Sequence, residues 1–199
     1  MIKNVLTALA ILALAGPAIA GDAAAGQAKS AVCAACHGVD GNSVNPEWPS
    51  IAGQHADYII HSLEAYQDGR RENVLMTAQA VVLSPEDMAD LAAYFSSQTP
   101  VGGEADPDLA PRGERIYRGG DPERGIAACI ACHGPQGQGN PVAGYPMIAG
   151  QHAVYAASQL RLYASGERRS DNNQMMRSIA RRMTEEDIRA VSSYIQGLR

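Results

Sequence analysis

Apolar residues recur at helical spacing in two stretches of the chain, one near the middle and one at the end. The residues that share this spacing are Met88, Leu91, Ala92 and Phe95 in the first stretch and Ile188, Val191 and Ile195 in the second. Each stretch follows a helix-start signal, because Ser84 and Thr184 each stand three residues before an aspartate. No stretch alternates convincingly between apolar and polar residues, so the pattern predicts an all-α protein.

The two halves of the chain carry the same features in the same order. The segment CAACHG at 33–38 returns as CIACHG at 129–134, and IAGQH at 51–55 returns at 148–152. Matches at a nearly constant separation indicate an internal duplication, with short insertions in loops. We therefore expect two tandem domains built on one plan.

The boundary between the halves is rich in Gly, Pro and acidic residues and lacks apolar periodicity, which is typical of a linker. We assign the linker to 100–111, the first domain to 21–99 and the second to 112–199. Each domain is expected to contain a short helix with the cysteine pair, a second helix that starts near Gln54 or Gln151, a methionine-bearing loop and the capped final helix.

The first 20 residues have the pattern of a secretory signal peptide. Lys3 precedes an apolar run over 5–15, and AIA at 18–20 is a small-residue cleavage signal. A retained anchor is disfavoured because the run is shorter than the roughly 20 residues of a spanning helix. We therefore predict a signal peptide over 1–20, a mature chain from Gly21 and a periplasmic location.

Each cysteine pair is followed directly by a histidine, which is the CxxCH pattern of covalent c-type haem attachment. The predicted thioether residues are Cys33, Cys36, Cys129 and Cys132, and the predicted proximal iron ligands are His37 and His133. Cysteines three apart on a helix lie on one side and can meet the same edge of the macrocycle. A zinc site would have to join the two halves although each carries a complete motif, and a thioredoxin-like site would need a βαβ context.

The sixth iron ligand is predicted to be a methionine in each half. Met76 and Met176 recur in the duplication just ahead of the final helix, and a thioether ligand would leave no open site for a substrate. Met175 is the main rival in the second half because it is adjacent. His55 and His152 also recur, but we expect them to have a polar role near a haem edge or at a helix terminus.

Two further expectations concern the surroundings of the haems. The carbonyl groups of Pro49 and Pro146, or of residues beside them, are positioned to accept a hydrogen bond from the proximal histidine's free N–H. His61 has no counterpart in the second half and is expected to lie at the surface. The chain has one Trp and one Phe, so two bulky haems would supply core volume that large aromatic rings do not.

Charge is distributed unevenly between the halves. Residues 21–99 hold three basic and ten acidic side chains, a net charge of −7, whereas 100–199 hold twelve and eleven, a net charge of +1. Five arginines near the second methionine are candidates for docking an acidic partner: Arg168, Arg169, Arg177, Arg181 and Arg182. Neither half has the basic, aromatic-interleaved character of a nucleic-acid binder.

With these motifs in view, the mature chain closely resembles the cytochrome c4 family. The similarity covers AGDAAAGQAK, AVCAACHGVDGNS, ADPDLAPRGERIYRGG and VSSYIQGL. The resemblance implies two tandem class I cytochrome c domains, two covalently bound haem c groups with His/Met iron, and propionate groups that face each other across the interface. It also implies electron transfer from a respiratory donor complex to a terminal oxidase, with no small-molecule substrate. Peripheral membrane association is left open.

Three functional hypotheses follow, and the first is a free periplasmic electron carrier that is not an enzyme. The second is the cytochrome subunit of a periplasmic oxidoreductase, such as a flavocytochrome of sulfur oxidation. The third is a dihaem peroxidase, which the duplicated methionines disfavour because such an enzyme needs a displaceable iron ligand.

Overall fold

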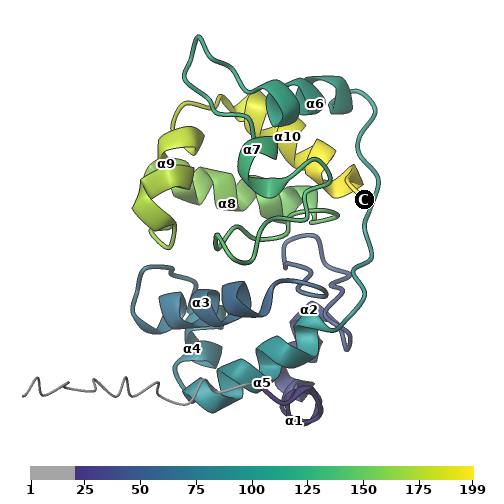
Figure 1. The fold of residues 1–199 in the computed structure, drawn as a ribbon, viewed down its shortest axis with the longest axis vertical. Helices are drawn as coiled ribbons and strands as arrows, with labels where there is room; N and C mark the ends of the chain where they lie inside the picture. Colours follow the sequence, from purple (N-terminus) through teal and green to yellow (C-terminus); the bar gives the residue numbers. More distant parts are fainter. Residues whose placement is uncertain (1–20) are drawn as a thin grey trace, which may run out of the picture.

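The computed structural model describes residues 21–199, and the predicted signal peptide lies outside the described residues. This part of the chain is helical, with two isolated β-bridges and no sheet, which confirms the predicted all-α class. Two bodies are stacked along the long axis and joined by one extended segment (Figure 1). No helix within 21–199 is long and apolar enough to cross a membrane.

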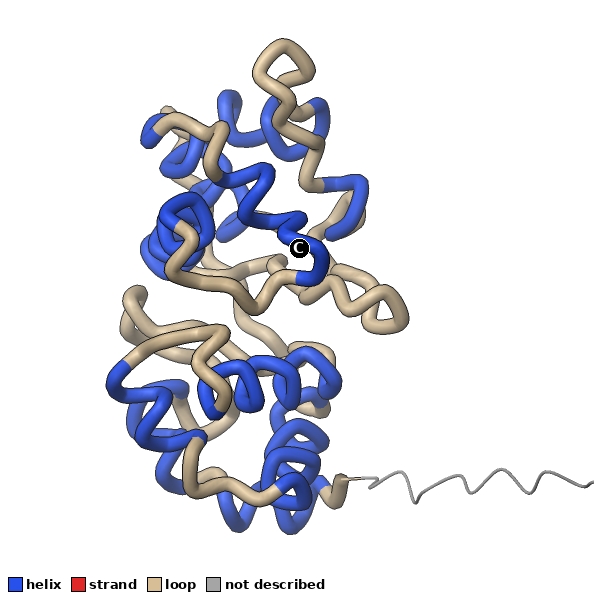
Figure 2. Tube along the Cα trace, turned by 90° about the vertical axis from the view of Figure 1, so that its left-hand side faces the viewer, coloured by secondary structure: helices blue, strands red, loops and turns tan. Residues whose placement is uncertain are grey.

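Each body contains the helices of one half of the chain. The first has α1 (Ala23–Lys29), α2 (Ala31–His37), α3 (Ala56–Gln67), α4 (Val74–Ala80) and α5 (Pro85–Ser96). The second has α6 (Ala110–Gly119), α7 (Ile130–His133), α8 (Ala153–Ser165), the 3-10 turn η1 (Asn172–Gln174), α9 (Met175–Ala180) and α10 (Glu185–Gly197). The boundary between the bodies is formed largely by loops (Figure 2).

The same helix crossing organises both halves, α1 against α5 and α6 against α10. A glycine at each crossing permits close backbone approach. A Cβ atom on Gly26 would lie 2.0 Å from the carbonyl oxygen of Asp90, and one on Gly113 would lie 2.2 Å from that of Ala190. Any side chain there would force the helices apart, so these two glycines set the helix packing.

The final helices start as predicted. Ser84 and Thr184 accept a hydrogen bond from the backbone N–H of Asp87 and Asp187, and each aspartate accepts one from the cap residue's N–H. These reciprocal bonds satisfy two backbone donors that a helix start otherwise leaves open. The capping boxes therefore fix where α5 and α10 begin.

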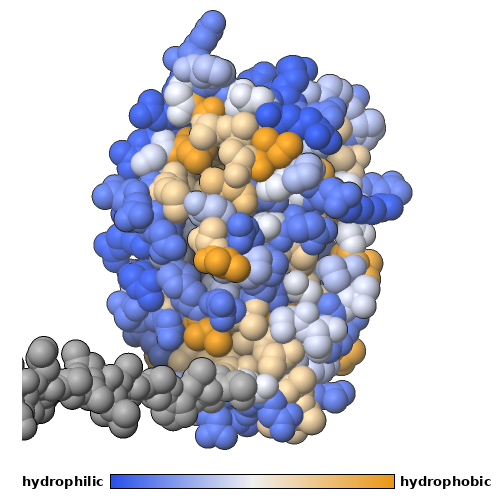
Figure 3. Space-filling view, viewed as in Figure 1, coloured by the Kyte–Doolittle hydropathy of each residue, from blue (hydrophilic) through white to orange (hydrophobic). Residues whose placement is uncertain are grey.

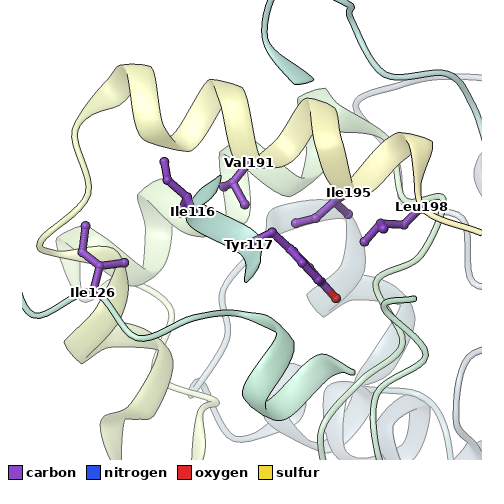
Figure 4. Packing of buried hydrophobic residues seen from close by; sticks show 6 residues of the cluster. All are labelled: Ile116, Tyr117, Ile126, Val191, Ile195 and Leu198. Atoms are coloured by element: carbon purple, nitrogen blue, oxygen red, sulfur yellow. The ribbon is translucent and has the colours of Figure 1, made fainter. Parts of the chain in front are cut away.

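An apolar cluster holds each final helix. The second half's cluster contains Ile116, Tyr117, Ile126, Val191, Ile195 and Leu198. Figure 4 shows the Tyr117 ring beneath α10 with its hydroxyl directed away from that helix, and this hydroxyl donates to the carbonyl of Gly134 at 2.6 Å. The first half's cluster contains Ile59, Leu91, Ala92, Tyr94 and Phe95. Each cluster therefore fastens the final helix of its half.

One expected element was wrong, because the methionines lie in short helices and not in loops. Met76 belongs to α4, where the Asn73 side chain accepts a hydrogen bond from its N–H at 3.0 Å. Met176 belongs to α9, which follows two residues with positive φ, Asn173 and Gln174. These short helices lack the long apolar repeat on which helix prediction depends. Asn73 caps α4, whereas Gln174, the N-cap residue of α9, makes no side-chain cap hydrogen bond.

Candidate haem sites

One hollow of about 980 Å³ runs through both halves of the molecule. All eight predicted haem-site residues line it: Cys33, Cys36, His37, Met76, Cys129, Cys132, His133 and Met176. On the face shown in Figure 3, apolar residues gather in the middle of the upper half and toward the bottom of the lower half, with mostly hydrophilic residues between them. The fold thus brings each half's cysteines, histidine and methionine to the wall of a shared cavity.

All four cysteines are free and partly buried. Cys33 lies inside α2, whereas Cys129 is the N-cap residue of α7, so the second motif begins one turn nearer to its helix start. Burial raises the pKa of both thiols, that of Cys129 to about 11. Uncharged thiols at Cys33 and Cys129 fit thioether attachment better than thiolate ligation of a metal.

The two histidines predicted as proximal ligands are oriented by the carbonyl groups predicted for them. His37 Nδ1 donates to the Pro49 carbonyl at 2.8 Å, and His133 Nδ1 donates to that of Pro146 at 2.9 Å. Burial lowers the pKa of both rings, and these hydrogen bonds only partly oppose it. Each ring is therefore neutral with its Nδ1 occupied, which leaves the Nε2 lone pair for iron.

The methionine assignments stay predictions, because several sulfur atoms reach the hollow. Met147, Met175 and Met183 line it together with Met176. Met175 Sδ lies 4.0 Å from the Tyr145 hydroxyl, a contact at the limit of a hydrogen bond to sulfur. The repeat register pairs Met175 with Leu75, which has no sulfur, and so favours Met176.

The donor set and the cavity fit a haem in each half. Each half combines a pair of reduced cysteines, one buried histidine with a free ring nitrogen, and at least one thioether at the cavity wall. This is the ligand chemistry of a c-type haem iron. Among residues 21–199, no group of three His, Cys, Asp or Glu side chains forms another metal site.

Comparison with known proteins agrees with this site. The cytochrome c family model matches residues 23–99 and 111–199. Cytochrome c4 of Pseudomonas aeruginosa is 48% identical over 172 residues, which cover 86% of each chain. The crystal structure of reduced recombinant cytochrome c4 from Pseudomonas stutzeri superposes with a TM-score of 0.87 at 46% identity, covering 90% of this chain and all of that one.

The chain belongs to the cytochrome c4 family. It is a dihaem c-type electron carrier with two cytochrome c domains and two covalently bound haem c groups. Its cytochrome c4 homologues are periplasmic. A further relative, the thiosulfate dehydrogenase electron acceptor of Thiomonas intermedia, is 36% identical over 172 residues, which cover 84% of this chain and 78% of that protein.

The two rival histidines, His55 and His152, lie at the boundary between the halves. His55 and His152 are the N-cap residues of α3 and α8, which confirms the expected position at a helix terminus. Their Nε2 atoms donate across the boundary between the halves, to the carbonyls of Gln138 and Ser43, each at 2.8 Å. Both rings are thus engaged in holding the two domains together.

The glutamine before each of these histidines joins the halves in the same way. The Gln54 side chain donates to the Met147 carbonyl at 2.8 Å and accepts from its N–H at 3.0 Å. Gln151 makes the matching pair with the backbone of Ser50 at 2.8 and 3.0 Å. Sequence reasoning missed this interface, although the identical IAGQH in both halves was the signal for it.

Two surface expectations were wrong. His61 is half-buried and donates from Nε2 to the Ser170 carbonyl at 2.8 Å, so it is a boundary residue. Arg168 cannot dock a partner, because it is only 4% exposed. Arg169 and Arg177 pair with Glu72 and Asp171.

The exposed arginines that remain near α9 are Arg181 and Arg182, which have no carboxylate within 4.0 Å among the described residues. Their hydrogen bonds go to backbone carbonyls, those of Arg177 and Ser178 respectively. The candidate surface for an acidic partner is therefore smaller than the sequence predicted.

Proposed function

We propose that this cytochrome c4 carries electrons through the periplasm from a respiratory donor complex to a terminal oxidase. The proposed thioether residues are Cys33, Cys36, Cys129 and Cys132, and the proposed axial ligand pairs are His37 with Met76 and His133 with Met176. The proposal rests on one observation: the predicted cysteine, histidine and methionine residues of both halves line one continuous hollow. With one haem in each half, an electron can enter the protein through one haem and leave through the other.

Haem iron supplies a one-electron ferric/ferrous couple, and the chain sets its properties. The Pro49 and Pro146 carbonyls hold the proximal rings in one orientation, which raises their basicity as ligands. A methionine opposite each ring would raise the reduction potential relative to a second histidine and leave no position for a substrate. We therefore propose a carrier that is not itself an enzyme.

The proposed path can be tested with the purified holoprotein. Fully reduced protein is mixed anaerobically with membrane vesicles that contain a terminal oxidase, and oxygen is then admitted. Rapid reoxidation that is sensitive to an oxidase inhibitor supports the proposal. Reoxidation no faster than in vesicles without the oxidase contradicts it.

A second candidate is an electron acceptor in sulfur oxidation. It is favoured by the 36% identity to the thiosulfate dehydrogenase electron acceptor of Thiomonas intermedia. If it holds, thiosulfate and a thiosulfate dehydrogenase together reduce both haems within the turnover time of that enzyme, whereas thiosulfate alone does not. Reduction only by a respiratory donor would favour the first candidate.

Two features of the chain's organisation belong to the same proposal. We assign export to a cleaved signal peptide over 1–20, and one haem each to domains 21–99 and 112–199, joined by a linker at 100–111. Mass spectrometry of the periplasmic protein and of its proteolytic halves reads out both. A mature chain that begins at Gly21 and two single-haem fragments are the expected results.

A further inference from the structure

Two glutamine side chains bind the backbone of the opposite half at matching places. Gln54 of the first half bonds to the N–H and the carbonyl of Met147, and both residues are buried. Gln151 of the second half bonds to the same two groups of Ser50. Ser50 and Met147 occupy the same position in the duplication. At this position, therefore, each half has its backbone occupied by a side chain of the other half.

This backbone position directly follows the proline that orients a predicted proximal histidine. The peptide group that joins Pro49 to Ser50 contains the carbonyl of Pro49 and the N–H of Ser50. Its carbonyl accepts a hydrogen bond from His37 Nδ1 at 2.8 Å, and its N–H donates to Gln151 Oε1 at 3.0 Å. Because a peptide group is planar and rigid, a single unit connects the histidine ring of one half to the glutamine of the other.

The second half repeats this arrangement with the halves exchanged. One peptide group joins Pro146 to Met147. Its carbonyl accepts from His133 Nδ1 at 2.9 Å, and its N–H donates to Gln54 Oε1 at 3.0 Å. Both histidine rings belong to buried residues, so the peptide carbonyl and not water is the acceptor for each Nδ1. Each half thus supplies a glutamine to the peptide that holds the other half's histidine.

The acceptor oxygen of each glutamine is itself fixed in place. Gln151 Oε1 also accepts from the backbone N–H of His152 at 3.1 Å, and Gln54 Oε1 accepts from that of His55 at 3.0 Å. Each amide nitrogen donates to a carbonyl of the other half at 2.8 Å. A backbone N–H can only donate, so these contacts require oxygen and not nitrogen at this end of the amide. Each side chain is therefore held in one orientation.

Hydrogen bonds at the two ends of one peptide group strengthen each other. Donation from the N–H polarises the group and makes its carbonyl a stronger acceptor, by about 10–30% per bond. A stronger acceptor at Nδ1–H makes the imidazole a more basic ligand through Nε2. A more basic ligand stabilises ferric iron relative to ferrous iron, which lowers the reduction potential. The glutamine of one half can therefore act on the iron of the other half.

We infer that Gln151 is a positioning residue for the haem site of the first half and Gln54 for that of the second, so that each half tunes the proximal histidine of the other. The inference rests on His37 and His133 being the proximal ligands, as proposed above. Its consequence is a crossed effect. Removing Gln151, which belongs to the second half, raises the reduction potential of the first haem, and removing Gln54 raises that of the second. A glutamine that only joined the halves would produce no such crossing.

The test is a redox titration of the holoprotein followed by proton NMR, in which the ferric haem methyl signals report each haem separately. The variants are Gln151→Leu and Gln54→Leu. In Gln151→Leu, the ferrous-to-ferric ratio of the first haem at a fixed poise is expected to rise about threefold, which is about 28 mV for a one-electron couple. Gln54→Leu is expected to have the same effect on the second haem. In each variant the other haem should keep its potential.

The matched control is His61→Leu. It removes another hydrogen bond across the boundary, to the Ser170 carbonyl, that involves neither proline. Both potentials are expected to stay unchanged in this control. A change in it as large as in the glutamine variants would mean that any loosening of the boundary shifts the haems, which would overturn the inference.

A second pair of variants, Gln151→Glu and Gln54→Glu, separates hydrogen bonding from packing. Glutamate has nearly the same size and keeps an oxygen that accepts from the peptide N–H, so the potential of the opposite haem should not rise. A rise as large as in the leucine variants would overturn the inference. So would a leucine variant that shifts the haem of its own half, or shifts both haems equally.

The ring protons of His37 and His133 are recorded in the ferrous protein as well. The haem ring current displaces the protons of an iron-bound imidazole far upfield. If the unmutated protein lacks this displacement, the proposed proximal ligation and the crossed tuning both fail. If the displacement is present and the potentials do not shift crosswise, the ligation stands and only the role of the two glutamines fails.

Discussion

The two halves share their haem chemistry and differ in the surface around the methionine. The first half places apolar side chains there, and the aligned positions of the second half are polar, sulfur-bearing or cationic. The aligned residues are Val74, Leu75, Val81 and Val82 in the first half and Gln174, Met175, Arg181 and Arg182 in the second. Val74 is 89% exposed and Val82 is 76% exposed. Both halves thus keep the residues predicted to hold a haem, but they differ in the surface that a partner protein would contact.

A second difference lies at the start of the final helices. Asp87 is partly exposed and pairs with Lys29, whereas Asp187 is fully buried and pairs with both Arg112 and Arg124. The same capping aspartate is therefore part of a half-exposed ion pair in one half, and in the other it is a buried carboxylate held by two partly exposed arginines. These contrasts lead to five predictions.

The largest effect is expected when one haem is removed. Cys33→Ala with Cys36→Ala should leave the first half poorly folded, because its cluster of five buried residues includes one alanine and lacks the extra aliphatic residues of the second half. Cys129→Ala with Cys132→Ala should leave more residual structure. Proton NMR of both variants measures this, and a well-dispersed, haem-free first half would contradict the prediction.

The next effect concerns the axial sulfur atoms. Oxidised protein should show the weak long-wavelength sulfur-to-iron band with an intensity that corresponds to two haems. Met76→Ala and Met176→Ala should each remove half of it, because each removes one thioether ligand. Met175→Leu is the control and should leave the band intact. Loss of the band in that control would move the second ligand to Met175.

A smaller effect is expected at the capping aspartates. Asp187→Asn should destabilise the second half by about 3 kcal/mol, because it leaves two arginines beside a buried neutral group. Asp87→Asn removes the half-exposed ion pair with Lys29 and should destabilise the first half by less than Asp187→Asn destabilises the second. Denaturant unfolding followed by circular dichroism compares them. Equal decreases in the free energy of unfolding for the two variants would show that burial does not distinguish the two ion pairs.

The same aspartate implies a pH dependence. Burial by itself would raise the pKa of Asp187, but hydrogen bonds from Arg124, Thr184 and Arg112 lower it well below its usual range. Its stabilisation is therefore complete above the ordinary Asp pKa of about 3.9 and is lost as the pH falls from there through the folded-state pKa. In Asp187→Asn this part of the acid destabilisation should disappear.

The smallest effect is expected on encounter rates. Reversing Arg181 and Arg182 to Glu should slow the reaction with one redox partner by about tenfold at low salt and leave the other partner nearly unaffected. Salt should weaken the effect because it screens exposed charges. Val81→Ser with Val82→Ser is the matched change in the first half, and its effect should not depend on salt. Equal slowing with both partners would mean that the charge difference does not steer docking.

Prediction from the sequence succeeded where the signal is local. The capping boxes at Ser84 and Thr184 depend on residues three apart, and the spacing of the CxxCH motifs is equally short-range. It failed for the methionine segments, because six or seven helical residues are too few to show a period. It also failed for His61, whose partner Ser170 is 109 residues away in the sequence.

The sequence by itself determined the duplication, the all-α class and the haem-attachment chemistry, because each depends on residue type and on spacing within a few turns of chain. Only the tertiary structure decided what joins the halves. Gln54 meets Met147 across 93 residues, and Arg168 meets Tyr58 across 110. Such contacts depend on how two finished domains dock, and a polar residue looks the same in sequence whether its partner is water or another domain. For that reason Arg168, counted as a surface charge from sequence, is a buried cation in the fold.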